Sequence, residues 1–262
     1  MIVFSAICPH PPILIPTIGK DNLDKIKQTE KAMKNLEQEL YASKPDVVLV
    51  ISPHGELIPD AFSLNLNSVY SADFENFGDF KTKMEFKSSP KLSLRIKERV
   101  EDQLPIVLVS EPKLDHGIGV PLYYLSQHLK GIKIIPVYYS LLDYKLHYLF
   151  GQLIKKELVK SDQRVAVIAS GDLSHCLIKG APAPYSAQGE KFDTKLVELI
   201  SKKQYEKIMK MDKKLIEKAA ECGLRSFLIL FGIIEQIEHN PEVLSYEGPF
   251  GVGYLTVNFK FK

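Results

Sequence analysis

Short apolar runs alternate along the chain with longer stretches in which apolar residues recur at helical spacing. The runs are rich in Val and Ile, and their length and composition predict buried strands. They cover residues 2–7, 47–51, 106–109, 134–139 and 165–169. Three further segments, 62–66, 80–86 and 255–261, alternate apolar with polar residues. This period of two predicts half-exposed strands that join the sheet in antiparallel fashion.

Amphipathic stretches between these runs predict helices. The first spans about 23–40, with Asp21 as a cap and Pro45 beyond its end, and the second begins at Ser89 and Pro90. Others are expected at 121–129, 144–158, 189–200, 212–220 and 224–238. Strands that alternate with helices indicate βαβ units. We therefore predict one α/β domain, residues 1–262, with a central mixed, largely parallel sheet flanked by helices.

The seven histidines fall into two groups. His128, His147 and His239 lie in or beside predicted helices with polar neighbours, and we expect them to face solvent. The other four each follow an apolar run, and they are His10, His54, His116 and His175. Each of these taken alone is equally well explained as a turn histidine bound to backbone. Because ligands bind outside the carboxyl ends of strands in open α/β sheets, we expect all four to converge on one crevice.

Converging imidazoles are suited to binding a metal ion and to moving protons near neutral pH. A site with two histidine ligands normally needs a carboxylate as well. Among the acidic residues near predicted turns, Glu221 stands out because Ala, Cys and Gly surround it at the junction of two helices. Its neighbour Cys222 is an alternative third ligand.

Composition narrows the class of protein. Hydrophobic residues make up 45% and charged residues 25% of the 262 residues, which is typical of a globular protein with a full core. The net charge of +2 gives no field that would recruit nucleic acid or an anionic membrane. The three cysteines are far apart and form no CxxC pair, which favours reduced thiols in a cytoplasm. No apolar stretch approaches the ~20 residues of a membrane span. We expect a soluble cytoplasmic protein.

Several motifs taken together resemble a known family. The segments "CPHPPIL", "DVVLVISPHGE", "LDHGIGVPL" and "SGDLSH" occur in that order, and they resemble the class III extradiol ring-cleavage dioxygenases of the LigB type. The segments "GAPAPYSAQGEKFD", "AECGLRSFLILFG" and "YEGPFGVGYL" resemble the microbial branch close to the Memo-like proteins of the AmmeMemoRadiSam system.

This resemblance implies a non-haem Fe(II) site and a catecholic aromatic substrate that is cleaved with O2. It implies His10 and His54 as metal ligands, with the third ligand at about Glu221, or at Cys222 because the Memo-like branch has cysteine there. His175 corresponds to the acid/base histidine, and His116 to one near substrate and dioxygen. In such a site Asp172 and Ser174 are expected to orient the His175 ring, as outer-shell partners of catalytic histidines do.

Two other functions stay open. A metal-dependent hydrolase would use Zn(II) to activate water. A Memo-like protein would hold a metal in a partner pathway without ring cleavage. Cys222 as a ligand would favour either one, because thiolate suits zinc or copper better than a dioxygenase iron. The aromatic substrate is not specified by the sequence, and a homo-oligomer is one alternative for the oligomeric state.

Overall fold

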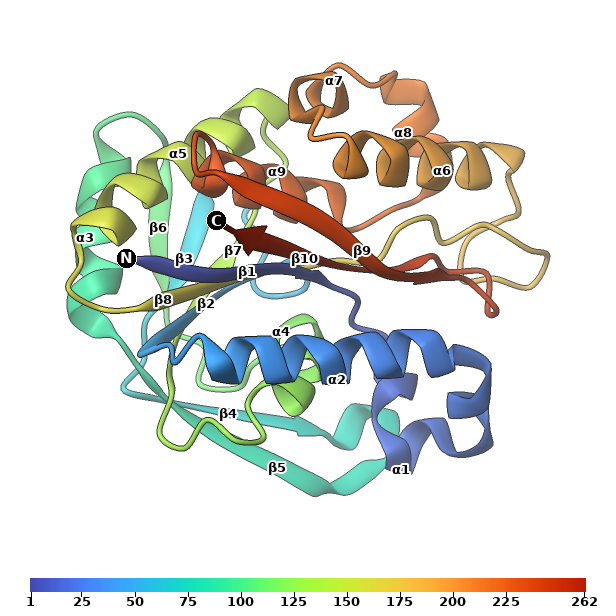
Figure 1. Ribbon diagram of the computed structural model, residues 1–262, viewed down its shortest axis with the longest axis horizontal. Helices are drawn as coiled ribbons and strands as arrows, with labels where there is room; N and C mark the ends of the chain where they lie inside the picture. Colours follow the sequence, from blue (N-terminus) through green and yellow to red (C-terminus); the bar gives the residue numbers. More distant parts are fainter.

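The computed structural model describes all residues, 1–262, as one α/β domain built on a mixed, largely parallel sheet of ten strands (Figure 1). This confirms the predicted fold class. The main strand order is β4-β5-β7-β2-β8-β1-β10-β9, with β3 paired to both β7 and β6. The strands are β1 Ile2–Cys8, β2 Val47–Ser52, β3 Phe62–Asn65, β4 Val69–Phe74, β5 Asp79–Ser88, β6 Ile106–Val109, β7 Lys133–Tyr138, β8 Val165–Ser170, β9 His239–Glu247 and β10 Tyr254–Phe261.

The centre of the sheet consists of four parallel strands, β7, β2, β8 and β1. These are four of the five predicted apolar runs, and nearly every residue in them is buried because helices cover both faces. The fifth run, β6, is also a strand but is only half-buried. It pairs with β3 alone, so the prediction of a buried strand there is wrong.

Antiparallel strands complete the sheet. β10 pairs with β1 and β9 with β10 on one side, while β4 pairs with β5 on the other. The predicted half-exposed pattern holds for β5, but β3 and most of β10 are buried. The predicted antiparallel pairing holds for β10 on β1 and β3 on β7, whereas β5 joins the sheet in parallel with β7 and β3 also pairs in parallel with β6. The sequence analysis did not predict β4 or β9. In β4 the buried residues Tyr70, Ala72 and Phe74 do alternate with polar ones, whereas β9 follows no such period.

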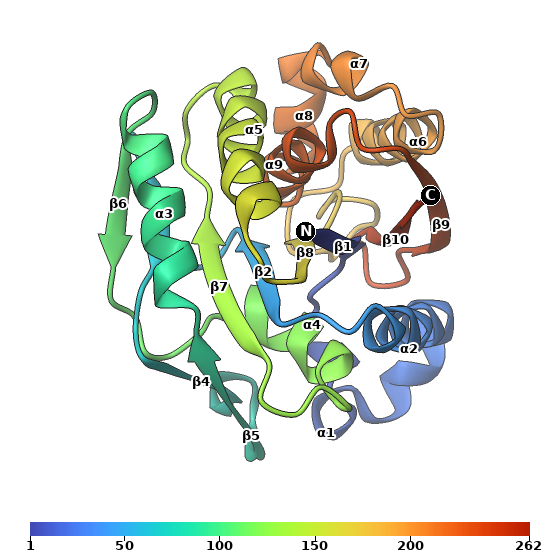
Figure 2. The same ribbon diagram turned by 60° about the vertical axis from the view of Figure 1, so that its left-hand side comes forward.

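Two layers of helices enclose the sheet (Figure 2). Helices α3, α5, α9 and α6 pack on one face and contribute to a core of 41 buried residues; α2 and α4 pack on the other, in a core of 28. The helices are α1 Pro16–Gly19, α2 Lys27–Ala42, α3 Pro90–Glu101, α4 His116–Leu125, α5 Tyr144–Lys160, α6 Ala187–Ser201, α7 Tyr205–Met209, α8 Lys213–Ala219 and α9 Leu224–Ile234, with 3-10 turns η1 Pro12–Leu14, η2 Lys20–Ile26 and η3 Glu75–Phe77. None of the helices has the length and apolar character needed to cross a membrane.

Helix boundaries differ from the prediction mainly at α4. We predicted its start at residue 121, but it begins at His116, because the carboxylate of Asp115 accepts a hydrogen bond from the Ile118 N–H and caps the helix. The prediction that three histidines face solvent holds for His128 only. His147 is buried in α5, and His239 is buried in β9 rather than in a helix.

Helices α5 and α9 pack very closely because each has a glycine at the contact. A Cβ atom at Gly151 would lie 2.0 Å from the Ile229 carbonyl oxygen, and one at Gly232 would lie 2.1 Å from that of Tyr148. Neither helix backbone can move away without opening the core beneath it. The two glycines therefore set the distance between these helices.

We expect Gly232→Ala to lower the free energy of unfolding by about 1–3 kcal/mol, the usual cost of overpacking. In a helix without this close contact, replacing Gly with Ala would stabilise the protein by about 1 kcal/mol. The sign of the change in unfolding free energy therefore shows whether the contact is crowded. Urea unfolding of the variant measures the effect, and Lys156→Ala on the exposed face of α5 is the control. A Gly232→Ala protein at least as stable as the wild type would contradict this account of the packing.

Candidate metal centre

The predicted histidines meet at the carboxyl edge of the sheet because their strands are neighbours. β2, β8 and β1 lie side by side, and Ala169 in β8 is level with both Ile7 and Ile51. His10, His54 and His175 each follow one of these three strands. His116 reaches the same place by another route, as the first residue of α4.

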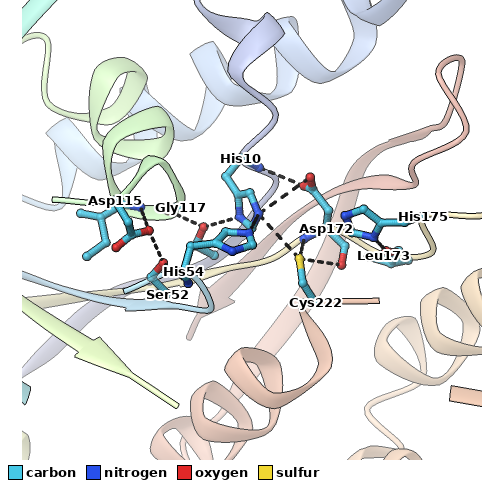
Figure 3. Close-up of polar contacts among 11 residues, drawn as sticks. His10, Ser52, His54, Asp115, Gly117, Asp172, Leu173, His175 and Cys222 are labelled. Atoms are coloured by element: carbon cyan, nitrogen blue, oxygen red, sulfur yellow. Dashed lines mark hydrogen bonds and ion pairs between the residues drawn. The ribbon is translucent and has the colours of Figure 1, made fainter. Parts of the chain in front are cut away.

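Three side chains offer donor atoms that lie within 4.8 Å of one another: His10, His54 and Cys222. The Nε2 atoms of the two histidines are 3.0 Å apart, and the Cys222 Sγ is 3.6 Å from the His10 Nε2 (Figure 3). His10 is buried, whereas His54 is exposed, so the cluster can be reached from one side. Two imidazoles and a thiol at this spacing match the donor set of a divalent transition metal.

The tautomer of His10 follows from its other ring nitrogen. The Ser170 hydroxyl donates its hydrogen to the Gly117 carbonyl, so its oxygen is left to accept from His10 Nδ1 at 2.8 Å. With the proton on Nδ1, the lone pair of Nε2 points at His54 and Cys222. An outer hydrogen bond of this kind is the usual device for orienting a metal-binding histidine.

The protonation states favour metal binding by the imidazoles. Burial and the neighbouring imidazoles lower the pKa of His10 well below its usual value. His54 has an exposed edge, but its ring packs against His10 and His116, and this desolvation together with the neighbouring imidazoles lowers its pKa to about 4. Both rings are therefore neutral at pH 7. Burial raises the pKa of the Cys222 thiol. A bound cation acts in the opposite direction and favours the thiolate.

A tight turn delivers Cys222 to the cluster. The N–H groups of Cys222 and Gly223 point to the Asp172 carbonyl oxygen at 3.4 and 3.0 Å, and the Asp172 N–H points back to the Cys222 Sγ at 3.3 Å. A Cβ atom on Gly171 would lie 2.2 Å from the Gly223 Cα. A side chain at position 171 would therefore prevent the two backbones from approaching so closely.

The carboxylate of Glu221 is not part of the cluster. One of its oxygens accepts a hydrogen bond of 2.6 Å from the Leu224 N–H at the start of α9, and the side chain lines a separate cavity. Of the two candidates for the third ligand, the structure therefore brings Cys222 to His10 and His54. The nearest carboxylate is that of buried Asp172, 3.9 Å from the His10 Nε2, and burial raises its pKa to about 7.

His116 and His175 lie on either side of the three donors. The His116 ring stacks on His54 with centroids 4.4 Å apart, and the ring of partly exposed Phe77 packs edge-on against it at 5.3 Å. His175 lies beyond Asp172 and Cys222 (Figure 3). Its Nδ1 lies 2.9 Å from the Leu173 carbonyl oxygen and donates to it, and the backbone of Ala220 also hydrogen-bonds to the ring.

The expected orienting role of Asp172 and Ser174 takes a different form. Neither residue hydrogen-bonds to the His175 ring. Asp172 instead accepts a hydrogen bond from the His10 backbone N–H at 3.0 Å. The hydroxyl of Ser174 pairs with the Cys176 thiol, and its N–H donates to buried Asp193. Both residues hold the backbone of the 172–176 segment, and the Leu173 carbonyl orients His175.

Two polar residues of the site were missed by the sequence analysis. Ser52 and Ser170 are the last residues of β2 and β8, and Ser52 donates a hydrogen bond of 2.6 Å to Asp115 at the start of α4. This bond ties the His54 loop to the His116 helix. A serine that ends an otherwise apolar strand was the available signal for both.

Comparison with known proteins identifies the family of this chain. The family model described as the catalytic LigB subunit of aromatic ring-opening dioxygenase matches residues 5–257. Protein CA_C1420 of Clostridium acetobutylicum is 33% identical over 258 residues, which is 95% of this chain and 55% of that protein. The 4,5-DOPA dioxygenase extradiol of Beta vulgaris is 29% identical over 209 residues, 73% of each chain. The chain thus spans about half the length of the Clostridium relative.

Solved structures share this fold. The uncharacterized protein JW3007 from Escherichia coli K12 superposes with a TM-score of 0.66 over 98% of this chain and 99% of that one, at 12% identity. At this level of identity the match concerns the arrangement of strands and helices only.

We expect His10→Ala, His54→Ala and Cys222→Ser each to lose most of the bound metal, because each removes one of three donors. The bound metal is measured by elemental analysis, first on protein purified without oxygen and then on the same protein after dialysis against Zn(II). His128→Ala and Glu221→Gln are the controls and should retain the metal. Loss of metal in Glu221→Gln together with retention in Cys222→Ser would instead assign the third position to the carboxylate.

We expect Ser170→Ala to weaken metal affinity by about 10–100-fold, the usual effect of losing an outer hydrogen bond to a histidine ligand. A competition titration against a chelator measures the change. Ser5→Ala is a matched control, because Ser5 is buried in the adjacent strand and its hydroxyl has no hydrogen-bond partner. Equal affinities of the two variants would count against the orienting role of Ser170.

Proposed function

The chain belongs to the family of the catalytic LigB subunit of aromatic ring-opening dioxygenases, and from this premise we propose that it is a metal-dependent extradiol dioxygenase-type enzyme that opens a catecholic ring with O2. The observation that carries the proposal is the convergence of the His10, His54 and Cys222 donor atoms within 4.8 Å. His116 and His175, on either side of them, supply the remaining polar groups of the site.

The metal is proposed to be held by His10, His54 and Cys222. Fe(II) is the ion that the family usually binds, and Zn(II) is the alternative for a donor set that includes a thiol. The donors fit a divalent cation, because both imidazoles are neutral and the Ser170 contact directs the His10 lone pair inward. A bound metal would supply the Lewis-acid and redox chemistry that activates a catechol and dioxygen.

The substrate is proposed to be a catechol. The Beta vulgaris relative, named a 4,5-DOPA dioxygenase extradiol, supports this choice. Phe77 gives further support, since its ring is 40% exposed and packs against His116, where a flat apolar substrate can lie against it. The rim of the site is thus partly aromatic, as expected where aromatic rings bind.

His175 is proposed as the acid/base residue. Its Nδ1 donates to the Leu173 carbonyl, and the other ring nitrogen, Nε2, is proposed to take a proton from a substrate hydroxyl and to return it later. Burial lowers the pKa of His175, and the ring is therefore neutral and able to act as a base at pH 7. General acid–base help of this kind contributes about 10²–10⁴-fold to the rate.

A second function is favoured by one observation, the thiol at the third position. Thiolate suits zinc or copper better than a dioxygenase iron. The second candidate is therefore a protein of the Memo-like type, which holds its metal for a partner pathway without ring cleavage. A zinc-dependent hydrolase uses the same donors and is tested by the same metal analysis.

The test is to load the protein with Fe(II) or Zn(II) without oxygen, add a panel of catechols, and then admit air. Oxygen uptake and a yellow ring-opened product are expected with Fe(II) alone. His175→Ala should retain its metal and lose about 10²-fold or more in turnover, whereas His128→Ala should be unchanged. Unaltered turnover in His175→Ala would refute the acid/base role. Full metal occupancy without oxygen uptake on any catechol would favour the Memo-like function.

A further inference from the structure

A cavity of about 440 Å³ lies beside the candidate metal centre and is separate from it. Its walls come from the loop after β7 (residues 141–144), from α8, and from the turn and first residues of α9. Figure 2 shows α8 and α9 next to α5, which begins at the end of that loop. Glu221, the neighbour of Cys222 in sequence, is one of its lining residues.

Arg225 in this wall makes no hydrogen bond or ion pair to the protein, although Glu221 lies near enough to interact with its charge. No carboxylate lies within ion-pair distance of its guanidinium and no group accepts a hydrogen bond from it, and its Nε is buried. Arg95 and Arg99, in contrast, both bind the carboxylate of Glu157 at 3.0 Å. Since buried donors are nearly always paired in folded proteins, an unpaired guanidinium that lines a cavity indicates a ligand.

Two tyrosines hold the guanidinium in place. Its central carbon lies 5.0 Å from the ring centre of Tyr144 and 5.8 Å from that of Tyr139. Stacking on aromatic faces restricts the orientation of the planar group without using its N–H donors. The fork is therefore positioned to bind a carboxylate through two hydrogen bonds.

The cavity also contains an unpaired negative group. Lys213 and Asp143 form an ion pair of 3.5 Å and largely cancel each other. Glu217, exposed on α8, has no cationic partner. The Glu221 carboxyl accepts from the Leu224 N–H and lies near the Gly223 N–H and the charge of Arg225. A simple anion bound to Arg225 would be repelled by these acidic groups. A ligand that carries both a negative and a positive charge would pair with Arg225 at one end and with the carboxylates at the other.

We propose that this cavity binds the zwitterionic end of an α-amino acid or a related amino carboxylate, with the carboxylate on Arg225 and the ammonium group on the carboxylates of Glu217 and Glu221. Leu141, Leu142 and Ile216 line the same cavity and provide an apolar surface for the side chain. The site uses none of the proposed metal ligands, so binding is expected in metal-free protein and does not depend on the ring-opening activity.

The test uses three fluorinated probes of the same ring size with metal-free protein, followed by fluorine NMR. They are 4-fluorophenylalanine, which has both charges, 3-(4-fluorophenyl)propionate, which lacks the ammonium group, and 4-fluorophenethylamine, which lacks the carboxylate. Charge-assisted hydrogen bonds at each end should make the amino acid bind about 10-fold or more tightly than either partial probe. Equal or tighter binding of the propionate or the amine, or no binding of any probe, would overturn the proposal.

Variants test which residues bind the carboxylate end and which bind the ammonium end of the ligand. Arg225→Met should abolish the advantage of 4-fluorophenylalanine over the amine, and Arg225→Lys should restore it only in part, since lysine lacks the fork. Glu217→Gln, at an exposed position where folding is safe, should remove the advantage over the propionate. Arg95→Met is the control and should bind all probes as the wild type does. If Arg225→Met or Arg225→Lys is folded by circular dichroism and binds 4-fluorophenylalanine like the wild type, the site is refuted.

Discussion

The parallel pairing of β2, β8 and β1 is the constraint on which the rest of the site depends. Because the three strands run in the same direction and end level with one another, the loops after them must leave the sheet at a single edge. Each strand is buried on both faces, so neither its position nor its register can shift without exposing apolar residues. Three histidines from distant parts of the sequence are thereby held at fixed separations.

The third donor is held by a different kind of contact. Cys222 does not belong to the sheet; its turn is docked on the backbone of Asp172, where Gly171 and Gly223 meet. The thiol therefore moves with the segment that also carries His175. A soft donor placed beside two neutral imidazoles broadens the range of metals that the site can hold. In the proposed metal site, the thiol is the donor that would distinguish this chain from iron-dependent members of its family.

The turn between α8 and α9 also links the metal centre to the neighbouring cavity. Cys222 points toward His10, while Glu221 and Arg225 line the cavity on the other side. Adjacent residues of one turn thus belong to two separate sites, the candidate metal centre and the cavity. A ligand that orders Glu221 and Arg225 would act on the same short segment that positions the thiol.

Much of this architecture can be predicted from the sequence, because continuous apolar runs such as those of β2 and β8 and amphipathic stretches such as α5 are local patterns imposed by burial. The placement of His10, His54 and His175 after such runs is likewise local. Other features depend on contacts between residues that are distant in sequence, and only the tertiary structure decided them. Examples are the burial of His147 and His239, the tautomer of His10 set by Ser170, and the choice between Glu221 and Cys222. Those two are neighbours in sequence, and only the docking of their turn on Asp172 determines which side chain faces the histidines.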